Sequence, residues 1–154
     1  MSNRSATWSR SLKSISTALA ILTFVVYAGY LIVYVVYAAN LFQWPFDYDQ
    51  GEGFELNDAI LYSHGEWPYR DNSVFPYYSS NYPPLFHLLI VPLLPIFGPN
   101  LIAGRIVSFL ATVITAATIS IAVRRRTGGL FIPAISGLGF LASNYVYQIG
   151  PLAR

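Results

Sequence analysis

All seven acidic side chains of this 154-residue chain lie between Asp47 and Asp71, in the one long polar segment between apolar runs. A carboxylate held at the start of a helix can act as a general base or bind a divalent cation. Asp49 opens the helix that we predict over residues 49–64, so it is the candidate catalytic residue. A plainer interpretation is that Asp49 caps this helix, because Asp49 and Glu52 have the spacing of a capping box. The two interpretations are compatible.

Three other kinds of side chain are candidates for binding. Arg105 lies near one end of an apolar run, where it either extends to lipid headgroups or binds a phosphate. His87 is more typical of an interfacial or hydrogen-bonded histidine than of a ligand. Tyr77, Tyr78 and Tyr82 form either an aromatic belt at a membrane surface or a platform for a sugar.

Several other chemistries are excluded by the sequence. The chain has no cysteine, so it has neither disulfides nor thiolate metal sites. It also has no glycine-rich phosphate loop and no His-x3-His metal motif, since His64 and His87 are 23 residues apart. The formal net charge of +2 is too small to indicate a nucleic-acid partner.

The composition predicts an all-α membrane protein. Residues are 55% hydrophobic and 10% charged, whereas soluble domains are about 25% charged. Residues 18–39 are uncharged and would form a helix of roughly 33 Å, enough to cross a bilayer core of about 30 Å. Residues 101–123 and 130–149 are predicted as the second and third spans. A cleaved signal peptide is the rival interpretation of the first run, but its apolar part is longer than such peptides carry.

Charge predicts the orientation. Positive residues mark the cytoplasmic side, so the basic segment 1–17 and the arginine-rich turn 124–129 are both expected inside a plasma membrane. Residues 40–100 then form an external loop, and residues 150–154 begin a second one. The apolar stretch 84–97 contains three prolines and is too short to span. We expect it to lie in the outer interface, with a proline-kinked fourth span as the alternative.

The external loop has internal order. Over residues 49–64 apolar and charged positions alternate at helical spacing, and Gly65 is a natural stop. With Trp44 and Trp67 on either side, this amphipathic helix is expected to lie flat on the outer membrane face.

Four motifs within residues 18–154, taken in order, resemble the N-terminal part of the GT-C membrane glycosyltransferases, in particular the protein O-mannosyltransferase-like and aminoarabinose-transferase-like superfamily. They are DQGEGF at 49–54, GEWPYRD at 65–71, NYPPL at 81–85 and FGPNLIAGR at 97–105. The resemblance implies many membrane helices, juxtamembrane helices in the first outer loop, and transfer of a sugar from a polyprenyl-phosphate donor to a hydroxyl acceptor.

The resemblance also implies roles for individual residues. Asp49 matches the catalytic aspartate, which would take the acceptor proton or hold a divalent cation. Glutamate is usual where this chain has Gln50, so Glu52 is the candidate for the second carboxylate. The segment at Asn81 and Tyr82 matches one in which some relatives place a lysine on the donor phosphate. Tyr82 lacks that charge, so the cation must come from elsewhere, and the candidates are Arg105 and Arg154.

Relatives of this kind are several times longer, so the resemblance implies that the chain is the N-terminal third or less of an enzyme. The alternative from another functional class is a small non-catalytic membrane protein, an assembly subunit or partner-binding module. A transporter fragment is disfavoured, because the apolar runs contain no acidic residue.

Overall fold

The computed structural model describes the backbone of residues 2–154 and the side chains of residues 11–154. Its regular elements are all helical, as the sequence predicts. They are α1 (Ser2–Gln43), α2 (Gly51–Ser63), α3 (Leu85–Ile90), the 3₁₀ turn η1 (Val91–Leu93), α4 (Leu94–Phe97), α5 (Leu101–Thr127), α6 (Phe131–Leu141) and α7 (Asn144–Ile149).

Within residues 11–154, two helices are long and apolar enough to cross a membrane. They cover Ser11–Gln43 within α1 and Leu101–Thr127, which is α5, and they contain the first and second predicted spans. Large apolar side chains of α1, such as Leu22 and Val25, are more than half exposed. Their exposure would be unfavourable in water and is suited to lipid, so these two helices are the features that indicate a membrane.

The ends of α5 follow from local chemistry. Asn100 is the N-cap, and its side-chain oxygen accepts a hydrogen bond from the Ile102 N–H at 3.1 Å. At the other end Gly128 adopts the left-handed conformation, with φ of 72°, that glycine reaches without steric cost. Its N–H donates to the carbonyl of Arg124, so the helix stops at the arginine-rich turn.

The third predicted span, residues 130–149, is wrong as one continuous helix. The backbone breaks between α6 and α7, where Ser143 is extended (φ −65°, ψ 136°). Serine and asparagine favour such helix starts over helix interiors, and Ser143 is followed by Asn144. The 11 residues of α6 give roughly 17 Å of helix, which is shorter than a bilayer core.

The proline-rich stretch Leu85–Phe97 forms three short pieces instead of one helix. Pro92 and Pro95 each lie in the first turn of a piece, η1 and α4 respectively, where the missing N–H is harmless. α3 packs on both α2 and α5, and the buried side chains of Ala59, Ile90 and Ala103 form the core between these three helices.

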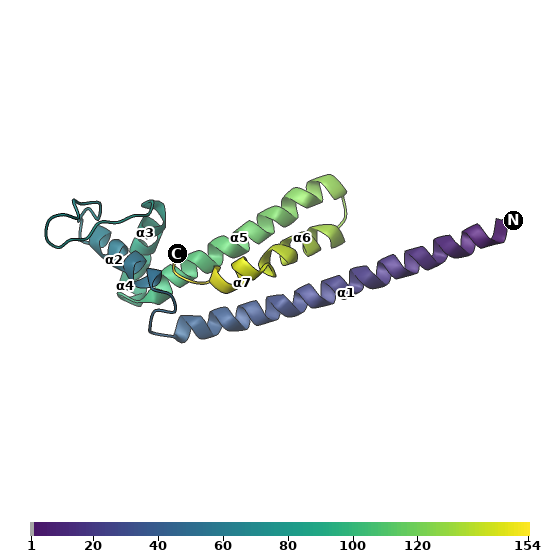
Figure 1. Cartoon of the computed structure of the whole chain (residues 1–154), viewed down its shortest axis with the longest axis horizontal. Helices are drawn as coiled ribbons and strands as arrows, with labels where there is room; N and C mark the ends of the chain where they lie inside the picture. The colour runs from purple at the N-terminus through teal and green to yellow at the C-terminus, as the bar shows by residue number, and fades with distance from the viewer. Residues whose placement is uncertain (1) are drawn as a thin grey trace.

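The short helices between α1 and α5 lie together at one end of the molecule (Figure 1). α5 and α6 form an antiparallel hairpin, and the C-terminal half of α1 runs beside it. Tyr34 of α1 is fully buried and stacks on Phe109 of α5, with ring centroids 5.7 Å apart. The helices α2, α3 and α4 gather at the end of the hairpin where the C-terminus also lies (Figure 1).

Candidate functional site

A buried ion pair fixes the loop helix α2 to α5. Arg105 and Glu52 are both fully buried. The arginine Nε donates to one carboxylate oxygen at 2.8 Å and Nη2 donates to the other at 2.7 Å. This bidentate geometry is the strongest arrangement that an arginine and a carboxylate form.

The same arginine also holds the chain that leaves α1. Its Nη1 donates to the carbonyls of Leu41 and Trp44, and Nη2 donates to the carbonyl of Phe46 at 2.9 Å. The guanidinium therefore lies inside the protein with its donors engaged. Neither expectation for Arg105, contact with headgroups or binding of a donor phosphate, describes this position.

Glu52 is equally occupied. Its carboxylate accepts further hydrogen bonds from the backbone N–H groups of Tyr48 and Ala153, both at 2.9 Å. Burial works to raise the pKa of this carboxyl, but the hydrogen bonds from Arg105, Ala153 and Tyr48 outweigh it and hold the pKa below its usual value. Glu52 thus links α2 to the loop at Tyr48, to α5 at Arg105 and to the C-terminal segment at Ala153. It is not placed as a second carboxylate facing a substrate.

The acidic side chains of α2 lie on its buried side, next to the core residue Ala59. The carboxylates of Glu52, Glu55 and Asp58 are buried against the protein, whereas Phe54 is 57% exposed. Residues three apart share a helix face, and on this helix the shared face is acidic. The three acidic side chains of α2 therefore lie on its protein-facing side, and the position of the helix at the membrane surface stays a prediction.

Glu55 and Asp58 surround the buried His87 of α3. The His87 Nε2 lies 2.5 Å from a Glu55 oxygen and 3.6 Å from an Asp58 oxygen. This confirms the hydrogen-bonded interpretation of His87. The Tyr78 hydroxyl donates to Asp58 at 2.6 Å. Burial and this hydrogen bond raise the pKa of Tyr78 to about 12, so its hydroxyl stays protonated.

Asp49 is not the N-cap of α2. Gln50 occupies that position without a side-chain cap bond. The Asp49 carboxylate accepts a long hydrogen bond of 3.3 Å from the Gly51 N–H, and the Asp49 carbonyl accepts one of 3.0 Å from the Glu52 N–H. The capping box with Glu52 does not form either, because the Glu52 carboxylate accepts from the Tyr48 N–H and not from the Asp49 N–H. The Asp49 carboxylate instead forms an ion pair with Arg154.

The Asp49–Arg154 pair is the accessible charged pair in this region. The Asp49 side chain is 30% exposed and the Arg154 side chain 44%, in contrast to the fully buried pair of Glu52 and Arg105. Glycine at position 51 permits the approach, since a Cβ there would lie 3.3 Å from the Arg154 Nε. A guanidinium carries five donors, so pairing with Asp49 leaves Arg154 able to bind a further anion.

Two cavities meet at Arg154, and Asp49 lines one of them. The first, about 510 Å³, is polar and contains Asp49, Asp58, the hydroxyl- and amide-rich segment Tyr77–Tyr82, and Arg154. The second, about 620 Å³, is mainly apolar and runs between α3 and α5, with Leu85, Leu89, Val107 and Ala111 among its lining residues. Gly51, Tyr82 and Arg154 line both. Asn81 lines the polar cavity, so the binding candidates Asn81, Tyr82 and Arg154 lie together beside Asp49.

Within the part of the chain that the structure describes, no three His, Asp or Glu side chains are arranged to hold a metal ion. The carboxylates that line the polar cavity beside Arg154 are Asp49 and the buried Asp58.

The sequence missed the partners of its candidates. Glu55 and Asp58 were visible as acids three residues apart on one predicted helix, which is the signal for a shared face. The pairing of Glu52 with Arg105, 53 residues along the chain, has no local signal. Comparison with protein-family models, with curated proteins and with solved structures gives no match for this chain.

Proposed function

We propose that this chain supplies the donor-binding part of a membrane glycosyltransferase. The donor is a polyprenyl-phosphate sugar and the acceptor is a hydroxyl group. The observation that carries the proposal is that Arg154 lines both a polar and an apolar cavity, while its partner Asp49 lines the polar one. A polyprenyl-phosphate sugar has the same order of parts: a polar head, an anionic phosphate and an apolar tail.

Each part of the donor has a chemical counterpart in the chain. Arg154 would bind the phosphate through a charge-assisted hydrogen bond. The cavity between α3 and α5 would take the first isoprene units, and the polar cavity would take the sugar. Arg154 replaces Arg105 in this role, because the guanidinium of Arg105 is buried and its donors are engaged.

The reaction uses Asp49 as general base. The acceptor oxygen forms a bond to the anomeric carbon while the bond between that carbon and the phosphate oxygen breaks. The acceptor proton passes to the Asp49 carboxylate, and polyprenyl phosphate leaves with the electron pair. Negative charge grows on the phosphate as it leaves, and the guanidinium of Arg154 stabilises that charge.

The experiment is a transfer assay with the protein in its native membrane and a radiolabelled polyprenyl-phosphate hexose. Asp49→Asn is expected to keep the protein level and lose transfer, because an amide cannot accept the proton. Asp71→Asn is the matched control, since Asp71 lies in the same loop but its carboxylate accepts hydrogen bonds from Ser73 and lines neither cavity; this variant is expected to transfer normally. Transfer by Asp49→Asn at the unmodified rate, or its absence from the unmodified protein, would exclude the proposal.

A further inference from the structure

A third cavity follows the outer face of α2. It has a volume of about 480 Å³. Helix positions 50, 53, 54, 57 and 61 line it, and their spacing of three and four residues makes them one continuous stripe. The stripe lies away from the buried face of Glu52, Glu55 and Asp58, so this groove is separate from the cavity between α3 and α5.

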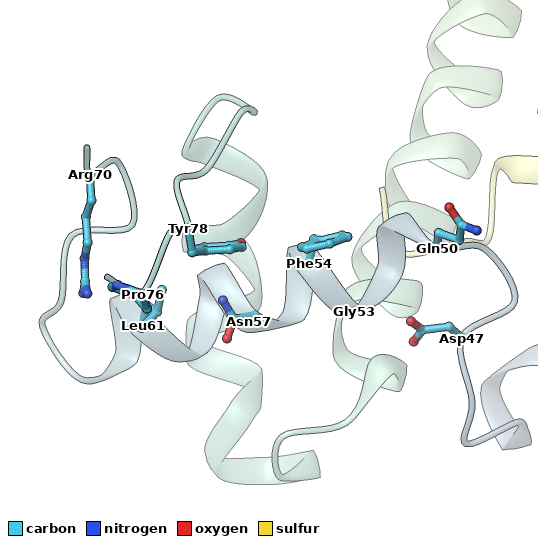
Figure 2. A pocket seen from close by; sticks show the side chains of 9 residues that line it. All are labelled: Asp47, Gln50, Gly53, Phe54, Asn57, Leu61, Arg70, Pro76 and Tyr78. Carbon is cyan, nitrogen blue, oxygen red and sulfur yellow. The ribbon is translucent and has the colours of Figure 1, made fainter. Parts of the chain in front are cut away.

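Two aromatic rings form a flat wall in the groove. Phe54 and Tyr78 are nearly parallel, with an interplanar angle of 12° and ring centroids 6.2 Å apart. Figure 2 shows the two rings edge-on, one beside the other. The ring of Tyr78 is fixed by its hydroxyl bond to Asp58. Phe54 is more than half exposed, so the platform has an open surface.

Polar groups surround the platform at intervals. The amides of Gln50 and Asn57 lie along the groove, with Asp47 at one end and Arg70 at the other (Figure 2). Arg70 is already bound to Glu66 and to the Trp67 carbonyl. The groove therefore offers hydrogen-bond donors and acceptors. The charge of Arg70 is balanced by Glu66, so the uncompensated charge of the groove is the Asp47 carboxylate, which favours a neutral ligand over an anionic one.

Aromatic faces beside amides and a carboxylate match the two surfaces of a sugar ring. Its C–H face packs on an aromatic ring, and its hydroxyls exchange hydrogen bonds with amides and carboxylates. A nucleobase would also stack on such rings, but the phosphates attached to it would be repelled by the Asp47 carboxylate, which lines the groove without a balancing cation.

The groove shares a wall with the polar cavity at Asp49. Gln50, Phe54 and Tyr78 line both spaces, and Gln50 is the neighbour of Asp49 in the chain. A carbohydrate in the groove would thus lie next to the sugar of a donor held in the polar cavity.

We infer that the groove along α2 binds a neutral oligosaccharide and that the acceptor hydroxyl of the proposed transfer belongs to a glycan rather than to a protein side chain. The binding of an oligosaccharide stands by itself, whereas its role as acceptor rests on the proposed function.

The test is saturation-transfer NMR on the chain in lipid nanodiscs, with mannotriose, cellotriose and maltotriose as probes and a threonine-containing hexapeptide for comparison. At least one trisaccharide is expected to bind and the peptide is not. Phe54→Ala should weaken binding by about fivefold or more through loss of the stacking surface. Because Phe54 is exposed, this variant is expected to remain folded.

A further variant controls for structure. Phe75→Ala removes an aromatic ring of the loop that carries Tyr78; this ring is 81% exposed and does not line the groove. The variant should bind as the unmodified chain does. Binding of no trisaccharide, binding of the peptide alone, or equal effects of Phe54→Ala and Phe75→Ala would overturn the inference.

The readout separates the two proposals. Asp49→Asn should bind the trisaccharide unchanged while it loses transfer. Trisaccharide binding that depends on Phe54, in a protein that shows no transfer, leaves the groove standing and removes the glycosyltransferase proposal. Transfer to a peptide hydroxyl without trisaccharide binding does the reverse.

Discussion

Replacing Arg105 by methionine is expected to destabilise the protein more than any change to an exposed charge. The substitution removes two hydrogen bonds to Glu52 and those to the carbonyls of Leu41, Trp44 and Phe46. The carboxylate of Glu52 remains buried with only two backbone N–H donors. Breaking a buried pair in this way costs about 3–5 kcal/mol, which shifts the folding equilibrium by roughly two to three and a half orders of magnitude.

The assay is denaturant unfolding in detergent micelles, followed by tryptophan fluorescence. Arg70→Met is the matched control, because the Arg70–Glu66 pair has side chains that are 35% and 50% exposed and such pairs contribute about 0–1 kcal/mol. The double variant Glu52→Gln with Arg105→Met should be less destabilised than the sum of the single variants, since no charge is left buried. A loss for Arg105→Met no larger than that for Arg70→Met would refute this reasoning.

Two further predictions concern acid stability and helix packing. The pKa of Glu52 is lowered from its usual 4.5, so the unfolded state binds more protons at acid pH; its contribution is present above pH 4.5 and is lost as pH falls through the folded-state pKa. Glu52→Gln should abolish this part of the pH dependence in unfolding titrations, and an unchanged dependence would contradict it. Gly137→Ala should destabilise the chain by about 1–3 kcal/mol, because a Cβ there would collide with Ser120 and lie 2.8 Å from the Ala116 carbonyl oxygen. Gly29→Ala, which meets nothing within 4 Å, is the control and should be neutral or slightly stabilising; equal thermal shifts would show that the α5–α6 contact is not tight.

Hydropathy and helical periodicity predicted those helices whose boundaries depend on neighbouring residues in the sequence. The acidic loop helix was expected over 49–64 and occupies Gly51–Ser63, and the two longest apolar runs lie within single helices. Residues 130–149 were predicted as one span because apolar composition alone does not register the helix break that Ser143 and Asn144 introduce. A hydropathy window averages over such residues.

The candidate site was predicted in part. Asp49, Asn81, Tyr82 and Arg154 were all identified from the sequence, and the structure brings them together. Their arrangement depends on contacts between residues far apart in the chain, such as Arg154 with Asp49, for which periodicity carries no signal.

The burial of the acidic side chains of α2 likewise depends on contacts between residues far apart in the chain. A helical pattern shows that acidic residues share one face, but it does not show that face packing against His87 and Arg105. Those partners come from other helices, so tertiary contacts decided which face of α2 became buried.

The most direct measurement for the central claim is the binding of farnesyl phosphate to the chain in nanodiscs, with farnesol as the ligand that lacks the phosphate. The account predicts that farnesyl phosphate binds more tightly than farnesol, and that Arg154→Gln weakens its binding about tenfold or more through loss of a charge-assisted hydrogen bond. Arg126→Gln, at the far end of α5, should leave binding unchanged. Equal affinity for the two ligands, or equal effects of the two arginine variants, would contradict a lipid-phosphate site at Asp49 and Arg154.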